Sequence, residues 1–319
     1  MTDAASPSVL SPASLEAAVL GELIIVMTVG AVIVFALTMG ALAWSLRRGP
    51  KPEVSTRWWV LGAGIAFPAV VLTALLAYGT LRTVGLERGL KDPALVVGVI
   101  GRLWWWELRY RDPVSGREVV SANELRIPVG RRVQLGLMSD DVVHSFWVPQ
   151  LGGKMDLVPG RVNRLVITAQ QPGLYRGQCA EFCGTQHTKM ALHVLAMPAD
   201  AFDEWLAAQT ASQADTRAGR QATDTPTTDP PGRQAFVANG CSACHAVDAA
   251  PGGPRLAPTL AQVASRAYLG AGVLPNEAGA LRRWLGDIQA LKPGARMPSY
   301  AHLDAATLDS LAEYLETLR

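Results

Sequence analysis

Two long apolar stretches near the start of the chain constrain its fold more than any other feature. They span residues 15–46 and 58–81 of 319. Each is longer than the roughly 20 residues that a helix needs to cross a bilayer. A helical hairpin in a soluble core is the alternative, but apolar runs with so few charges disfavour it. Residues 1–91 are therefore predicted to form an N-terminal segment and two transmembrane helices, the first kept as an anchor.

The loop between these stretches is basic and sets the expected orientation. It contains Arg47, Arg48, Lys51 and Arg57 against one acid, Glu53. Basic loops stay in the cytoplasm, so the rest of the chain is expected on the periplasmic or extracellular side of the membrane. The formal net charge of +2 is too small to indicate nucleic-acid binding.

One cysteine pair, Cys241 and Cys244, is followed at once by His245. This C-x-x-C-H spacing lets two thiols attach a haem while the histidine reaches its iron. A reducible dithiol and half of a zinc site are the alternatives, although no second Cys/His pair lies nearby to complete a zinc site. An electron-transfer haem of this type needs a sixth ligand, for which Met297 is favoured over His302.

The other cysteine pair, Cys179 and Cys183, lies in a run that continues to His187 and Met190. Soft sulfur ligands together with imidazole favour copper. Two thiolates on one loop can bridge two copper ions, and His144 can supply the remaining histidine. A disulfide between the two cysteines is the alternative in an oxidising compartment.

Residues 92–206 are predicted to form a β-sandwich, because short runs of alternating or clustered apolar residues are separated by Gly and Pro. His193 lies in one such alternating strand and is expected to face solvent. A polar segment, 207–231, is predicted to be a flexible linker. Residues 232–319 are predicted to form a compact helical domain from their apolar periodicity.

Residues 94–206 resemble the CuA domain of cytochrome c oxidase subunit II, whose signature is H-S-[FW] followed by C-x-E-x-C-x-x-x-H-x-x-M. The resemblance implies a Greek-key cupredoxin sandwich and a dinuclear copper site. Its implied ligands are His144, Cys179, Cys183, His187, Met190 and the backbone carbonyl of Glu181. The Glu181 side chain is implied to help bind a magnesium ion shared with the catalytic subunit.

The segment 101–110 resembles the aromatic strand of the same family, in which the first tryptophan of W-x-W passes electrons to the copper site. That role falls on Trp104. An aromatic strand that only packs on the sheet is the alternative. On strand alternation Trp104 and Trp106 share one face and Trp105 takes the other.

Residues 232–319 resemble class I cytochrome c over their whole length, with Cys241, Cys244, His245 and Met297 as the implied haem-binding residues. A loop beginning at Pro258 resembles the family's loop that orients the haem histidine through a backbone carbonyl.

Together the resemblances imply subunit II of a caa3-type haem-copper oxidase with a fused cytochrome c domain. Electrons would pass from a donor, such as a cytochrome c or a quinol–cytochrome c reductase complex, through haem c and CuA to haem a of subunit I. Oxygen reduction and proton translocation belong to the complex, which also includes other subunits and membrane lipid. A CuA-containing subunit of a nitric oxide reductase is the alternative, and a quinol oxidase subunit or membrane scaffold would lack the copper ligands.

Overall fold

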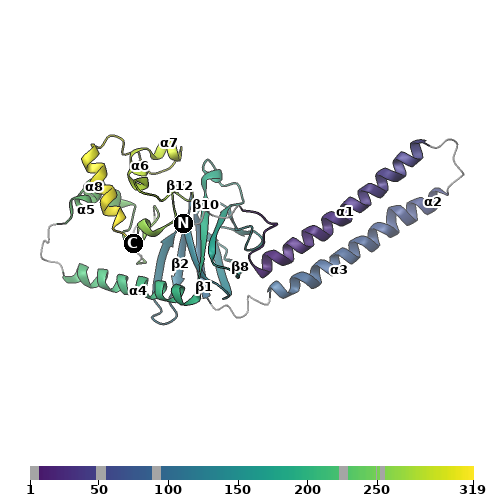
Figure 1. Cartoon of the computed structure of the whole chain (residues 1–319), viewed down its shortest axis with the longest axis horizontal. Coiled ribbons are helices and arrows are strands. Elements are labelled where there is room, and N and C mark those ends of the chain that lie inside the picture. Colours follow the sequence, from purple (N-terminus) through teal and green to yellow (C-terminus); the bar gives the residue numbers. More distant parts are fainter. Residues whose placement is uncertain (1–6, 48–54, 88–94, 223–228, 249, 252–255) are drawn as a thin grey trace.

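The computed structural model describes residues 7–47, 55–87, 95–222, 229–248, 250–251 and 256–319. It contains an N-terminal helical hairpin, a β-sandwich and a C-terminal helical domain (Figure 1). Three residues of the basic loop used to predict the orientation lie outside the described residues. They are Arg48, Lys51 and the acidic Glu53.

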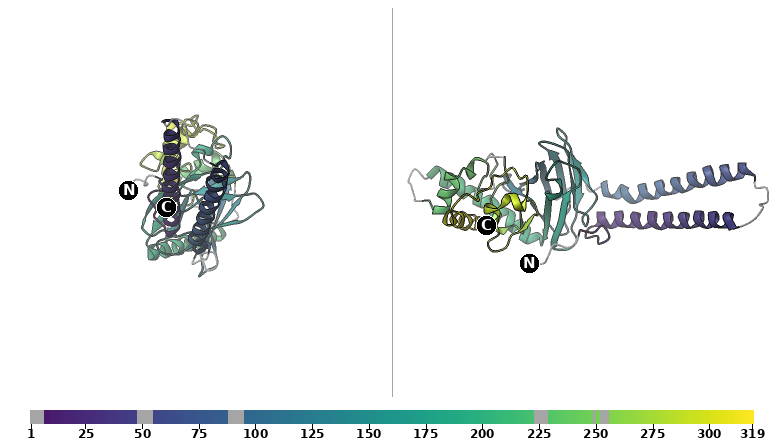
Figure 2. Two further views of the ribbon diagram at one scale, coloured as in Figure 1. Left: turned by 90° about the vertical axis from the view of Figure 1, so that its right-hand side faces the viewer. Right: turned by 90° about the horizontal axis from the view of Figure 1, so that it is seen from above.

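The hairpin consists of α1 (Leu15–Arg47) and a second helical stretch made of α2 (Thr56–Trp58), η1 (Trp59–Ala66) and α3 (Phe67–Glu87). Both stretches are long and apolar enough to span a membrane. They run side by side away from the sandwich (Figure 2), with apolar side chains such as Phe35 and Leu72 exposed. The π-helical η1 precedes Pro68, whose ring removes one helical hydrogen bond. The predicted pair of long apolar helices is confirmed.

Polar contacts pair the two helices and attach them to the sandwich. The Tyr78 hydroxyl donates to Glu22 at 2.6 Å, and Arg82 forms an ion pair with the same carboxylate. The Thr168 hydroxyl of the sandwich donates to Glu16 at 2.9 Å. The sandwich therefore lies at the end of the hairpin where α1 begins and α3 ends.

Within residues 95–197, ten strands form two five-stranded sheets with the orders β3-β2-β1-β5-β8 and β4-β10-β9-β6-β7. The first sheet contains β1 (Leu95–Arg102), β2 (Trp105–Arg111), β3 (Glu118–Ala122), β5 (Val133–Ser139) and β8 (Asn163–Ile167). The second contains β4 (Glu124–Pro128), β6 (His144–Trp147), β7 (Met155–Leu157), β9 (Gly173–Cys179) and β10 (Ala191–Met197).

Alternating apolar side chains from both sheets fill the space between them, which is the pattern expected of packed sheets. Val97, Leu135 and Leu192 are among the fully buried residues of this core. The predicted sandwich of the cupredoxin type is confirmed. The strands β6 and β9 are hydrogen-bonded neighbours, with Phe146 opposite Cys179. This pairing matters for the site because His144 begins β6 and Cys179 ends β9.

The polar segment after the sandwich begins as a helix rather than as a flexible linker. Helix α4 (Ala199–Ala222) continues well past position 207, and residues 223–228 lie outside the described part of the chain. Phe202 and Leu206 anchor its first turns in the sandwich core. Alanine and glutamine are good helix formers, so the helix continues once its start is fixed.

The C-terminal domain packs four helices around a small core. They are α5 (Pro231–Ala238), α6 (Ala280–Gly286), α7 (Ile288–Leu291) and α8 (Ala305–Glu316), accompanied in the described residues by the short turns η4 (Cys241–Ala243) and η5 (Val263–Ser265) and by the ribbon of β11 (Tyr268–Leu269) and β12 (Leu274–Pro275). Leu308, Leu311 and Leu315 face inward along α8, as their spacing predicts. Asp304 caps this helix by accepting a hydrogen bond from the Thr307 amide.

The C-terminal domain rests on the outer face of the second sheet. Tyr268 stacks on His193 with ring centroids 4.0 Å apart and planes 7° from parallel. The expectation that His193 faces solvent is therefore wrong. The strand β10 forms as predicted, but a second domain covers the face of the sheet that would otherwise be exposed to solvent.

Candidate functional site

Five side chains of the copper motif converge at one end of the sandwich. His144 begins β6, Cys179 ends β9, and Cys183 lies in the loop that follows. His187 lies in η3 (His187–Lys189), and Met190 comes directly after it. The backbone pins this arrangement, because the amide of Cys179 donates to the Met190 carbonyl at 2.9 Å and that of Ala180 donates to the Ser145 carbonyl at 2.9 Å.

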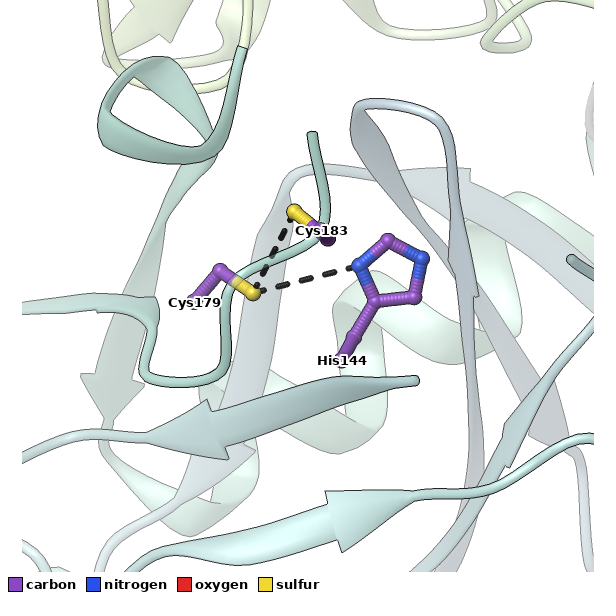
Figure 3. A group of neighbouring side chains, drawn as sticks. All are labelled: His144, Cys179 and Cys183. Carbon is purple, nitrogen blue, oxygen red and sulfur yellow. Dashed lines mark hydrogen bonds between the residues drawn. The ribbon is translucent and has the colours of Figure 1, made fainter. Parts of the chain in front are cut away.

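The distances between the ligand atoms are short. Cys179 Sγ lies 3.8 Å from His144 Nδ1 and 3.7 Å from Cys183 Sγ (Figure 3). Cys183 Sγ in turn lies 3.6 Å from His187 Nδ1 and 3.9 Å from Met190 Sδ. The carbonyl oxygen of Glu181 is 3.1 Å from Cys179 Sγ. All six predicted donors are thus brought together.

The two sulfur atoms are not bonded, since a disulfide requires about 2.05 Å, and both cysteines are free. Their contact lets the pair share one proton, which lowers the pKa of Cys179 to about 3 and raises the pKa of Cys183. A pair that loses its first proton so readily is suited to binding metal as thiolate. Two thiolates, two imidazoles, a thioether and a carbonyl form a soft donor set that fits copper.

His144 is held by two features that the sequence reasoning missed. Asp141 Oδ1 lies 2.8 Å from His144 Nε2, which leaves Nδ1 directed at the sulfur atoms. Burial lowers the pKa of His144, but contacts with Cys179 and Asp141 outweigh burial and raise it overall. The signal for Asp141 was its position three residues before His144.

The second feature is Gly101 in β1, which lies directly against the imidazole. A Cβ at this position would lie 2.7 Å from His144 Cδ2. Atoms cannot approach so closely without displacement, so only glycine leaves room for the ring. No sequence pattern indicated this contact, because Gly101 and His144 belong to different sheets.

Trp104 lies in the turn between β1 and β2, partly buried beside the copper motif. Its indole N–H donates to the carbonyl oxygen of Cys183 at 2.8 Å. Trp106 is fully buried and packs on the His144 ring with centroids 6.2 Å apart. Trp105 is also buried, under the Arg102 guanidinium. Trp104 also contacts the C-terminal domain, because its carbonyl oxygen accepts a hydrogen bond from Lys292 Nζ at 3.2 Å.

The Glu181 side chain is accessible to solvent. It is 45% exposed, and its nearest basic group is the Lys154 ammonium at 3.9 Å. A carboxylate that remains this accessible beside the motif is free to meet a cation or a partner surface.

The C-terminal domain carries the second motif in and after the turn η4. Cys241 is buried, Cys244 is partly buried, and both are free thiols. His245 Nδ1 lies 2.7 Å from the carbonyl oxygen of Pro258. A carbonyl can only accept, so Nδ1 carries the proton and Nε2 keeps its lone pair. Burial lowers the pKa of His245 and keeps the ring neutral, as a metal ligand requires.

The two candidates for the sixth haem ligand differ in burial. Met297 packs, partly buried, against the core that contains Cys241, and its carbonyl accepts from Gln289 Nε2 at 2.9 Å. His302 is exposed. Its packing against this core favours Met297, because the sixth ligand must reach the iron of a haem that is attached at Cys241.

These features define a membrane-anchored redox protein with a copper-type site on a β-sandwich and a cytochrome-type domain attached to it. Comparisons with known proteins agree. Residues 115–197 match the family "Cytochrome C oxidase subunit II, periplasmic domain", and residues 230–319 match the family "Cytochrome c".

Two curated relatives match this chain over most of its length. Cytochrome c oxidase subunit 2 of Alkalihalophilus pseudofirmus is 32% identical over 93% of this chain and 85% of its own length. The corresponding protein of Bacillus sp. (strain PS3) is 32% identical over 80% of this chain and 70% of its own length. The crystal structure of the periplasmic domain of subunit II of cytochrome oxidase of Bradyrhizobium japonicum is 27% identical over 37% of this chain and 94% of that chain, with a TM-score of 0.34.

The chain therefore belongs to the cytochrome c oxidase subunit 2 family, in a form with a fused cytochrome c domain. It is an oxidoreductase subunit of a haem-copper oxidase.

Proposed function

We propose that the chain is the electron-input subunit of a caa3-type oxidase and carries a dinuclear copper centre and one covalent haem c. The observation that supports this most directly is the cluster in which the ligand atoms of His144, Cys179 and Cys183 all lie within 4.8 Å of one another. His187, Met190 and the Glu181 carbonyl complete the proposed copper ligands. When bound, the haem and the copper pair supply one-electron transfer from a donor toward haem a of subunit I.

The protein would hold the copper pair and the haem in a rigid environment. The sheet fixes the copper ligands, since His144 begins β6, Cys179 ends β9 and Met190 directly precedes β10. Ligands held by a stiff frame change position little between redox states. In the C-terminal domain Cys241 and Cys244 would attach the haem, and His245 and Met297 would hold its iron.

Several finer proposals accompany this function. Glu181 would join subunit I in binding magnesium, and the exposed apolar faces of α1 and α3 would contact subunit I and lipid. The membrane would be the bacterial inner membrane, with both redox domains on its periplasmic or extracellular side. A cytochrome c or a quinol–cytochrome c reductase complex would act as donor.

Metal analysis of the purified complex tests the proposal. We expect about two copper ions per chain, one covalent haem and a mixed-valence copper EPR signal. Replacement of Cys183 by Ser should abolish that signal, because one thiolate cannot bridge as two do. One copper ion per chain in the parent protein would contradict the bridged site, and consumption of nitric oxide in place of oxygen would contradict the oxidase.

A further inference from the structure

Lys292 occupies an unusual position for a lysine. It is only 6% exposed, and it follows α7 in the C-terminal domain. Its ammonium donates to two backbone carbonyls, that of Trp104 in the sandwich at 3.2 Å and that of Gly270 in its own domain at 3.0 Å. A buried ammonium is costly unless hydrogen bonds compensate. These two bonds join the domains at the residue that also contacts the cysteine loop.

Trp104 is contacted from the C-terminal domain in a second way. The Arg296 guanidinium lies 5.7 Å from the centre of its ring, and Arg296 directly precedes Met297. On its other side the indole N–H donates to Cys183. One side chain thus links the candidate copper loop to the segment that carries the candidate haem ligand.

Further contacts join residues 267–272, which include Gly270, to the sandwich and form the seam between the two domains. The Ala191 amide donates to the Ala271 carbonyl at 3.0 Å, and the Ala267 amide donates to Glu124 Oε2 at 2.7 Å. Gly272 lies so close that a Cβ there would be 2.9 Å from Ala191 Cβ. Such complementarity is typical of a permanent contact and not of a loose encounter.

From this geometry we infer that Lys292 is a positioning residue, which fixes the cytochrome domain over Trp104 and so sets the distance that an electron crosses between the two domains. The inference rests on the proposed function and adds to it a residue outside both ligand sets. Because electron transfer falls steeply with distance, a shift of the docked domain changes its rate while leaving both redox groups intact.

The test uses the full chain in its oxidase complex with Lys292→Met, which keeps the stem and removes the ammonium. Arg282→Met is the matched control, because it removes one positive charge from an exposed ion pair with Asp309 in the same domain. Two quantities are measured: amide hydrogen exchange at Ala191 and Ala267, and the rate of electron transfer from haem c to copper.

We expect amide exchange at Ala191 and Ala267 to become about tenfold faster or more in Lys292→Met, as the loss of a charged hydrogen bond implies. The rate of electron transfer from haem c to copper should fall by about tenfold or more, because the cytochrome domain is no longer held in place. Optical and EPR spectra should stay as in the parent, and Lys292→Arg should restore part of the rate. Parent-like exchange and rate in Lys292→Met would overturn the inference. If that variant does not assemble, Tyr268→Ala disrupts the same seam without unpairing a buried charge, and parent-like values there would equally overturn it.

Failure of the proposed function would look different. The parent protein would then lack the copper pair or the haem, whereas failure of this inference leaves both in place. The exchange measurement also needs neither group to be bound.

Discussion

The indole nitrogen of Trp104 lies 2.8 Å from the carbonyl oxygen of Cys183, so the cysteine loop is hydrogen-bonded directly to the turn that faces the cytochrome domain. Trp104→Phe should slow electron transfer to copper by about fivefold, as expected if the barrier rises by the ~1 kcal/mol of one hydrogen bond. Flash-induced reduction of the haem measures the rate. Trp105→Phe is the control, since Trp105 is buried under Arg102. Equal rates in both variants would argue against a role for Trp104.

Gly101→Ala should weaken copper binding by about tenfold or more, because overpacking a filled site costs about 1–3 kcal/mol. The new Cβ would meet His144 Cδ2 at 2.7 Å. Gly98→Ala is a matched control in the same strand, where the nearest atom, Arg109 Cβ, is 3.5 Å away. Copper content and EPR after dialysis measure the effect. Parent-like copper in Gly101→Ala would show that His144 can yield without loss of the site.

Met297→Ala should abolish the spectrum of a low-spin, Met-ligated haem, because Met297, which packs partly buried against the core that contains Cys241, is the proposed sixth ligand. His302→Ala should leave the spectrum unchanged, since His302 is exposed. Absorbance in the reduced state and near-infrared bands of the oxidised haem report the ligand. The assignment is reversed if only the His302 variant loses the spectrum.

Protonation of His193 should weaken the contact between the two domains at acidic pH. Burial, with a smaller effect from Arg176, lowers the pKa of His193 to about 4, below its ordinary value of about 6.5. The docked state therefore binds fewer protons than the opened state between these values. Its stability should fall as the pH drops from about 6.5 to 4, by at most about 1.4 kcal/mol per pH unit.

Hydrogen exchange at the Ala191 amide, followed between pH 7 and pH 4 and corrected for intrinsic exchange rates, measures this loss. His193→Gln should remove the part of the pH dependence that this ring contributes, while other histidines keep theirs. An identical pH profile in parent and variant would exclude the ring as its source.

Much of the candidate site was predictable because its residues are near neighbours in sequence. Cys179, Cys183, His187 and Met190 lie on one loop, and Cys241, Cys244 and His245 are nearly contiguous. Such spacings fix the chemistry before the fold is known. The pair of long apolar helices was predictable for a similar reason, since length and hydropathy are local properties.

Other features depend on contacts between distant segments. Nothing local shows that Gly101 meets His144, that Asp141 orients it, or that Lys292 reaches Trp104 across 188 positions. The continuation of α4 beyond position 207 depends on Phe202 and Leu206 being fixed in the core.

The sequence by itself determined which chemical groups the protein possesses and that it is anchored in a membrane. Both follow from local properties of the chain, namely the spacing of the motif residues and the length of the apolar runs. Only the tertiary structure decided how the two domains that carry the candidate redox sites contact each other. That arrangement comes from the packing of one domain's surface on another, where His193 is buried by Tyr268 and Trp104 is enclosed between two domains.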